Sequence, residues 1–269
     1  MDEPLDLDAY LERIQWGGDT RPALDTLAGL LRAHMLSIPF ENLDVLLGRR
    51  VRLDLEGIQD KLVRARRGGY CFEHATLFAA AVEALGFRPE RHAARVTLFV
   101  PRTQAPRTHM FLTVPLAEGT FVVDPGFGTL APRVPIPLVD AARVSVQHET
   151  HWMVRDGHCW MLRANVGGET VDGWVSTLET ENRVDFEMGN HYTATFPQSP
   201  FVNRLMMRAL TPDGRITVMN RDVTVWRAAG RQSAQLADRA ALRALLNRYF
   251  GFDLPEVGQL RVPSIPEWA

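Results

Sequence analysis

The spacing of apolar residues changes near Gly86, and this change limits the fold classes open to the chain. Before Gly86, apolar side chains recur at three- and four-residue steps, a period that predicts helices. From about Phe87 to Val175 they stand in short alternating or β-branched runs broken by glycine and proline, which predicts an antiparallel sheet or barrel. After Asn190 the signals are mixed, with a hairpin expected at residues 211–214 and a helix over 238–250. Helices and strands in separate stretches predict the α+β class.

The composition narrows the functional classes. The 269 residues carry a net charge of -2, whereas nucleic-acid-binding domains usually have a marked basic excess, so we expect no nucleic-acid partner. The apolar run Leu77–Val82 is far shorter than the ~20 residues that a membrane span needs. The acidic first residues do not resemble a secretory signal. We therefore expect a soluble, cytoplasmic protein with no membrane partner.

Cys71 stands at the start of a predicted helix that ends at Gly86. Amide N–H groups and the positive end of the helix dipole favour the thiolate form of a cysteine at this position. We expect the preceding glycines, Gly68 and Gly69, to let the backbone turn sharply and to leave room for a substrate carbonyl. A cytoplasmic chain with two cysteines is not expected to form a disulfide, so Cys71 is a candidate nucleophile. The alternative is that Cys71 is a small buried apolar residue, the commoner fate of a free cysteine.

His109 and Asp124 lie on two successive predicted strands, over 108–114 and 120–123, that are joined by a turn-rich segment. A hairpin folded about their midpoint places the two residues directly opposite each other, with Cβ atoms roughly 4.5–5.5 Å apart on one face. The carboxylate could then hold one ring nitrogen while the other faces a thiol, as in covalent catalysis. A core histidine and a turn-forming Asp-Pro-Gly are the alternative interpretations.

A metal-binding site is a second interpretation to weigh against the sequence. His148, His151, His158 and Cys159 lie close together in the sequence. Their spacing matches neither Cys-x-x-Cys nor His-Glu-x-x-His, so we predict no metal. The chain also lacks the phosphate-binding and dinucleotide-binding glycine motifs.

Five segments together resemble the arylamine N-acetyltransferase family. In chain order they run from near the N-terminus to beyond residue 200. A single segment would be weak evidence of a relationship, whereas five in order are strong evidence. They are Ile38-Pro39-Phe40-Glu41-Asn42-Leu43, Arg67-Gly68-Gly69-Tyr70-Cys71-Phe72-Glu73-His74, Thr108-His109-Met110, Val123-Asp124-Pro125-Gly126-Phe127-Gly128, and Asn190-His191-Tyr192 followed by Ser199-Pro200-Phe201. Pro125 and Ala75 depart from the residues usual in the family at those positions.

The resemblance implies an architecture and a site. The architecture is a helical bundle over residues 1–86 that carries the nucleophile, a central antiparallel β-barrel over 87–189 that carries His and Asp, and a C-terminal α/β lid over 190–269. The site has a papain-like placement of the three catalytic residues Cys71, His109 and Asp124. The resemblance also places Gly126, Phe127 and Gly128 near the pantetheine of the donor, acetyl-CoA, and Phe40 and Phe127 near the acceptor.

The activity that this resemblance implies is a ping-pong acetyl transfer through acetyl-Cys71. The acetyl group passes from acetyl-CoA to the nitrogen, or the N-hydroxy oxygen, of an arylamine, hydrazine or N-hydroxyarylamine. Three alternatives stay open: an amide synthase that closes polyketide macrolactams, a cysteine hydrolase or transglutaminase-like enzyme, and a non-catalytic binding protein. The physiological acceptor, the acyl chain of the donor and the oligomeric state are not indicated by the sequence.

Overall fold

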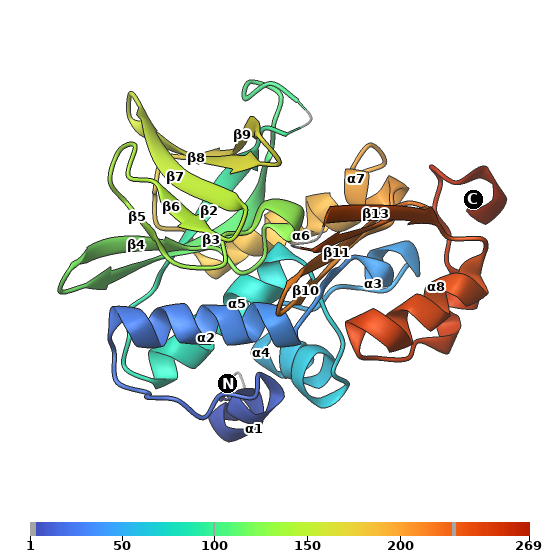
Figure 1. The fold of residues 1–269 in the computed structure, drawn as a ribbon, viewed down its shortest axis with the longest axis horizontal. Helices are drawn as coiled ribbons and strands as arrows, with labels where there is room; N and C mark the ends of the chain where they lie inside the picture. The colour runs from blue at the N-terminus through green and yellow to red at the C-terminus, as the bar shows by residue number, and fades with distance from the viewer. Residues whose placement is uncertain (1–3, 99, 228–229) are drawn as a thin grey trace.

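The computed structural model describes residues 4–98, 100–227 and 230–269. Helices come first along the chain (Figure 1). They are α1 (Leu7–Arg13), α2 (Leu24–Ser37), α3 (Leu43–Leu46), α4 (Leu55–Ile58), a π-helical turn (Gln59–Arg64) and α5 (Cys71–Ala84). Most side chains of α5 are buried, so α5 is the central helix of this part.

An eight-stranded antiparallel sheet follows, in the order β5-β4-β3-β2-β9-β8-β7-β6. Its strands are β2 (Glu90–Val96), β3 (Arg107–Leu116), β4 (Gly119–Val123), β5 (Ile136–Pro137), β6 (Val144–Val146), β7 (Glu149–Asp156), β8 (Cys159–Val166) and β9 (Glu169–Ser176). A bridge between Asp140 and Met153 brings the segment after β5 beside β7, so the sheet curls into a nearly closed barrel. The predicted antiparallel barrel is confirmed.

A second antiparallel sheet has the order β1-β10-β11-β12-β13. Its strands are β1 (Phe40–Glu41), β10 (Met206–Thr211), β11 (Gly214–Met219), β12 (Asp222–Arg227) and β13 (Gly230–Gln235). The predicted hairpin is the β10–β11 connection, where Thr211 pairs with Gly214. Because β1 comes from the N-terminal part of the chain, this sheet ties the helices to the C-terminal part.

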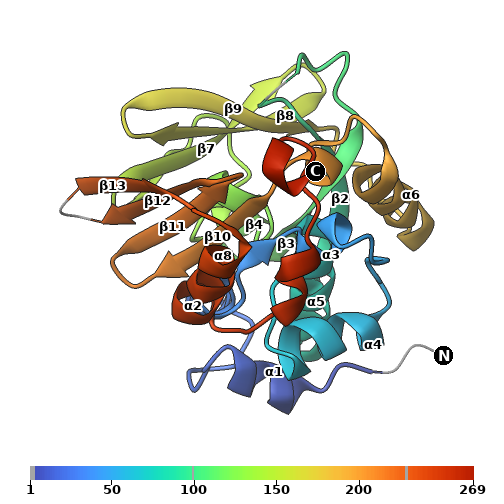
Figure 2. The same cartoon turned by 90° about the vertical axis from the view of Figure 1, so that its right-hand side faces the viewer.

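The remaining helices connect and cover these sheets (Figure 2). They are α6 (Arg183–Thr195), α7 (Pro200–Asn203), α8 (Arg239–Leu245), a π-helical turn (Leu246–Phe250) and the 3₁₀ turns Gly128–Leu130, Pro255–Gln259 and Pro266–Trp268. The predicted helix over 238–250 is therefore α8 and its π-helical turn, ended by Gly251 in the left-handed conformation.

The buried apolar residues form two clusters. The larger one joins α1, α2 and α5 to the barrel strands, and the smaller one lies between the second sheet and α8. The chain is thus α+β, as predicted. The exact division into residues 1–86, 87–189 and 190–269 stays a prediction.

Candidate active site

Cys71 is the first residue of α5, and its side chain is buried. The helix begins here because Tyr70 is extended and the Glu73 carboxylate accepts a hydrogen bond from the Tyr70 N–H at 3.0 Å, half of a capping box. Since α5 packs against β3, the sulfur lies 3.7 Å from the Thr108 carbonyl oxygen. The packing of α5 against β3 therefore places Cys71 beside the strand that carries His109.

Gly68 and Gly69 have a different role from the one expected. A Cβ atom at Gly68 would lie 2.1 Å from the Pro39 carbonyl oxygen, and one at Gly69 would lie 2.6 Å from a Glu73 carboxylate oxygen. The Gly69 N–H donates to that Pro39 oxygen at 3.2 Å, and its carbonyl accepts from the Glu41 N–H at 2.8 Å. The space left by the glycines is thus filled by the chain's own segment 39–41, and the expectation of room for a substrate carbonyl was wrong.

A buried network of ion pairs links the segment before Cys71 to neighbouring parts of the chain. Lys61 Nζ lies 2.8 Å from both Glu73 Oε1 and Asp44 Oδ2, and the Arg67 guanidinium contacts Asp44 and Glu41 at 2.7 Å each. Burial raises the pKa of Glu73, an effect that Lys61 opposes. Removal of one partner from such a network leaves an uncompensated buried charge, which is strongly destabilising.

His109 and Asp124 form the second half of the site. His109 Nε2 lies 2.8 Å from Asp124 Oδ2, and both side chains are buried. Cys71 lies near enough to the ring to contribute to the pKa shift of His109, and the ring's other nitrogen, Nδ1, is not used by Asp124. Burial alone would lower the pKa of His109, but the Asp124 carboxylate and Cys71 raise it to about 10. The structure therefore brings together the three residues predicted as a catalytic group.

The predicted register of the β3–β4 hairpin was wrong by two residues. Leu112 pairs with Val123 and Leu116 with Gly119, so the next step of the ladder places Asp124 opposite Phe111. The reason is the turn, which leaves only residues 117 and 118 between the paired ends. Because side chains alternate with a period of two, this shift keeps His109 and Asp124 on one face as diagonal neighbours.

The loop after Asp124 lies directly against Cys71. A Cβ atom at Gly126 would lie 2.6 Å from Cys71 Cα. The Phe127 ring is 4.9 Å from the His109 ring, and a Cβ at Gly128, which has a φ of +57°, would lie 3.5 Å from the Phe40 ring. Gly126, Phe127, Gly128 and Phe40 are thus gathered around the predicted catalytic group.

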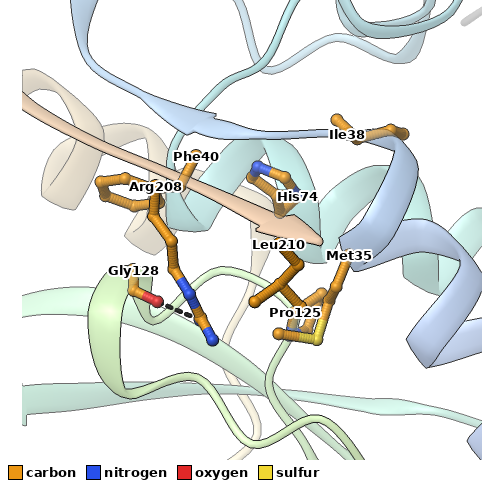
Figure 3. Close-up of a pocket in the computed structure, with 8 residues that line it drawn as sticks. All are labelled: Met35, Ile38, Phe40, His74, Pro125, Gly128, Arg208 and Leu210. Carbon is orange, nitrogen blue, oxygen red and sulfur yellow. Dashed lines mark hydrogen bonds between the residues drawn. The ribbon is translucent and has the colours of Figure 1, made fainter. Parts of the chain in front are cut away.

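A small cavity of about 10 Å³ lies beside this loop, room for one water molecule (Figure 3). Its lining comes from α2, β1, α5, the loop and β10. The lining residues are Met35, Ile38, Phe40, His74, Pro125, Gly128, Arg208 and Leu210.

Two residues of the site were missed or given no role in the sequence analysis. The Trp174 indole N–H donates to Asp124 Oδ2 at 2.9 Å, and no local pattern on β9 points to this contact. The Phe201 ring lies 6.3 Å from the Phe40 ring and 5.3 Å from the Tyr70 ring, centroid to centroid. Phe201 belongs to one of the five family-like segments, which was the signal that could have pointed to it.

Two of the four residues considered for metal binding, His151 and Cys159, have other partners. His151 Nε2 lies 3.1 Å from the Leu130 carbonyl oxygen, and Arg102 donates to Cys159. Over residues 4–98, 100–227 and 230–269, no three His, Cys, Asp or Glu side chains are grouped to hold a metal ion. In the same ranges no helix has the length and apolar character of a membrane span.

A buried cysteine at a helix start, close to a histidine that a carboxylate orients, is the arrangement of cysteine enzymes that form covalent acyl intermediates. The sequence model of a family described as N-acetyltransferase matches residues 23–258. The arylamine N-acetyltransferase of Mycobacterium tuberculosis is 38% identical over 260 residues, which are 95% of this chain and 92% of that protein. The Salmonella typhimurium arylamine N-acetyltransferase / N-hydroxyarylamine O-acetyltransferase is 33% identical, over 93% of this chain and 90% of that protein.

Solved structures agree with these matches. The M. tuberculosis arylamine N-acetyltransferase superposes with a TM-score of 0.89 at 38% identity, over 94% of this chain and 96% of the other. The Mycobacterium marinum enzyme in complex with CoA gives a TM-score of 0.89 at 36% identity, over 94% and 95%. The chain belongs to the arylamine N-acetyltransferase family. The matches favour acetyl transfer over the amide synthase and hydrolase alternatives.

Proposed function

We propose that Cys71, His109 and Asp124 carry out acetyl transfer from acetyl-CoA to an arylamine, hydrazine or N-hydroxyarylamine. The observation that carries this proposal is His109, which bonds the Asp124 carboxylate through Nε2 at 2.8 Å and lies near enough to Cys71 for the cysteine to raise the pKa of the ring. The CoA complex of the M. marinum enzyme supports a CoA donor, and the name of the Salmonella relative supports arylamine and N-hydroxyarylamine acceptors.

In the first half-reaction the Cys71 thiolate, paired with protonated His109, attacks the thioester carbonyl of acetyl-CoA. Amide N–H groups at the start of α5 stabilise the oxyanion that forms. The bond from carbonyl to CoA sulfur then breaks, His109 gives its proton to the leaving sulfur, and acetyl-Cys71 remains. The raised pKa of His109 keeps its ring protonated, and so ready to donate, at neutral pH.

In the second half-reaction the acceptor amine attacks the acetyl carbonyl. His109, now neutral, takes the proton that the amine loses, and the carbon–sulfur bond breaks to return the thiolate and release the amide. Asp124 holds one ring nitrogen throughout, so the other is aimed at the reacting atoms. The mechanism needs a small-molecule acceptor and uses neither a nucleic acid nor a metal. The cytoplasmic location of the protein stays a prediction.

The loop after Asp124 is proposed to receive the donor. Gly126 approaches the Cys71 backbone so closely that a side chain there would collide with it, which places the loop backbone at the nucleophile. Gly126, Phe127 and Gly128 would line the pantetheine, while Phe40 and Phe127 would contact the acceptor ring. Pro125 has no N–H, so this position cannot donate a hydrogen bond to the donor.

Initial-rate kinetics test the two-step scheme. With acetyl-CoA and an aromatic hydrazine varied together, double-reciprocal plots should give parallel lines, because CoA leaves before the acceptor binds. Lines that converge would mean that both substrates bind before any transfer, and the covalent scheme would be wrong.

A further inference from the structure

Arg208, on β10, is buried next to the candidate active site. It pairs across the ladder with Phe40, and its side chain is 4% exposed. Nη1 donates to the Gly128 carbonyl and lies 3.5 Å from the Ala131 carbonyl oxygen (Figure 3). Nε and Nη2 have no hydrogen-bond partner in the described chain, and no described carboxylate lies within ion-pair distance of the group. A buried guanidinium with open donors and no counter-charge is rare because it loses hydration without compensation.

Arg13 shows how this chain satisfies an arginine that has only a structural role. It is equally buried at 4% exposure. Its Nε donates to the Leu62 carbonyl at 2.8 Å, and its Nη2 donates to the Arg66 carbonyl at 3.1 Å. Unlike Arg208, Arg13 has no buried side-chain nitrogen without a partner. Burial and carbonyl contacts are thus common to both arginines, and the open donors distinguish Arg208.

The surroundings of Arg208 are rich in positive charge. Arg133 and Arg215 are also buried, and both form ion pairs with the same carboxylate, Glu149. Together with Arg208, three guanidinium groups thus have one ion-pair partner among them. Burial and the nearby Arg133 lower the pKa of Arg208 to about 9, while Asp124 opposes them. Asp124 itself is engaged with His109 and Trp174. An added negative charge would therefore be favoured here.

Arg208 lines a cavity together with Phe40, one of the two proposed acceptor residues. Arg208, Phe40, Pro125 and Gly128 line the same 10 Å³ space, whose other walls are mostly apolar. This space takes an oxygen-sized group as it stands. A larger group would need one wall to move, and Phe40 is the lining residue that is only partly buried.

We propose that Arg208 is a specificity residue that binds an anionic substituent, a carboxylate or sulfonate, on the acceptor. The acceptor's ring would lie against Phe40, with its amine toward Cys71 and its anionic group toward Arg208. Two charge-assisted hydrogen bonds from Nε and Nη2 match the geometry of a carboxylate. This proposal rests on the proposed function.

The test compares two acceptors that differ in one charge, 4-aminobenzoate and its methyl ester. In the wild type, the ratio of kcat/KM for the acid to that for the ester should exceed the corresponding ratio of their uncatalysed reactivities with a thioester. In Arg208→Met that ratio should fall about tenfold to a hundredfold, since a hydrogen bond between charged groups contributes about 1.5–3 kcal/mol. Arg208→Lys, which keeps the charge and loses the fork, should give an intermediate ratio.

Arg13→Met is the matched control, because it removes an equally buried guanidinium that does not line the cavity, and it should leave the ratio unchanged. Equal loss on both acceptors in Arg208→Met, or no preference in the wild type, would overturn the proposal. If Arg208→Met does not fold, the wild-type preference and the Arg208→Lys ratio decide. A further outcome is that chloride inhibits the wild type at constant ionic strength while the wild type shows no preference for the acid. This outcome would assign the site to free inorganic anions and would also overturn the proposal.

The mass of the protein after incubation with acetyl-CoA separates two kinds of failure. An acetylated wild type with no preference for the acid would reject the role of Arg208 alone. A wild type that gains no acetyl group would reject the proposed function on which that role rests.

Discussion

The indole N–H of Trp174 donates to Asp124 Oδ2, the same oxygen that holds His109, at 2.9 Å. The Gly126 N–H donates to the other carboxylate oxygen at 3.3 Å. Two strands and the loop beside Cys71 thus fix the carboxylate in one orientation. The Nε2 bond in turn fixes the orientation of the His109 ring. Trp174 is therefore a positioning residue for the proposed base.

Replacement of Trp174 by Phe tests this relationship. The variant keeps an aromatic ring beside Phe111 but loses one hydrogen bond to a charged group, which should lower kcat/KM about tenfold and the free energy of unfolding by about 1.5–3 kcal/mol. Steady-state kinetics and urea unfolding measure the two effects. Trp160→Phe, on the neighbouring strand β8, is the control and should retain wild-type kinetics. Unchanged kinetics in Trp174→Phe would show that Asp124 needs no such support.

The pH dependence of the first half-reaction follows from the raised pKa of His109. The histidine loses its proton only near pH 10, so the rate of CoA release in a single turnover should show no decline attributable to His109 between pH 7 and 9. Asp124→Asn removes the main cause of the rise and should move this decline toward the ordinary histidine value of about 6.5. It should also reduce turnover about 10³–10⁴-fold while the fold is kept. Near-normal turnover in Asp124→Asn would contradict the assigned role.

A buried chain of side chains predicts acid sensitivity. The Tyr10 hydroxyl lies 2.9 Å from His34 Nδ1, His34 Nε2 lies 2.9 Å from His74 Nδ1, and His74 Nε2 lies 3.2 Å from the Pro39 carbonyl oxygen. The carbonyl can only accept, so every link is satisfied if each group donates to the next and both histidines are neutral. Burial lowers the pKa of His74 to about 4 and holds that of His34 well below its usual value.

The stabilisation from neutral His74 is complete above about pH 6.5 and is lost as the pH falls toward 4, because the unfolded state binds a proton that the folded state does not. Its size is about 3 kcal/mol from the 1.36 kcal/mol that one pKa unit represents. In His74→Gln, the slope of unfolding free energy against pH between 6 and 4.5 should correspond to about one proton fewer. The exposed His158→Gln variant serves as the control. Identical slopes for His74→Gln and wild type would show that His74 does not titrate on unfolding.

Gly126 is predicted to tolerate no side chain. A Cβ atom there would lie 2.6 Å from Cys71 Cα, so Gly126→Ala must push the loop away from Cys71. We expect about 1–3 kcal/mol of lost stability and a loss of about 10²-fold in kcat/KM from the misplaced site. Gly17→Ala is the control, because a Cβ at Gly17 meets nothing within 4 Å. Wild-type kinetics in Gly126→Ala would mean that the loop does not need this close approach.

Much of the site could be predicted because its signals are local. The helix start at Cys71 and the hairpin that joins His109 to Asp124 both lie within short stretches of sequence. The two-residue error in register left the outcome intact, since a shift by an even number keeps both side chains on one face.

The contacts that could not be predicted join distant parts of the chain. Trp174 reaches Asp124 from β9, and Arg208 reaches Gly128 from the second sheet. No periodic pattern in one sequence encodes such tertiary neighbours. The sequence predicts a role for the glycines before Cys71, but the segment that fills the space at Gly68, residues 39–41, is about 30 positions earlier.

The central claim is that Cys71 carries the acetyl group, and intact mass measurement tests it most directly. Wild type and Cys71→Ala are incubated with acetyl-CoA and no acceptor, while released CoA is followed. We predict that the wild type gains one acetyl group, with a matching burst of CoA, and that Cys71→Ala gains none. An acetyl group on both proteins, or on neither, would contradict the account.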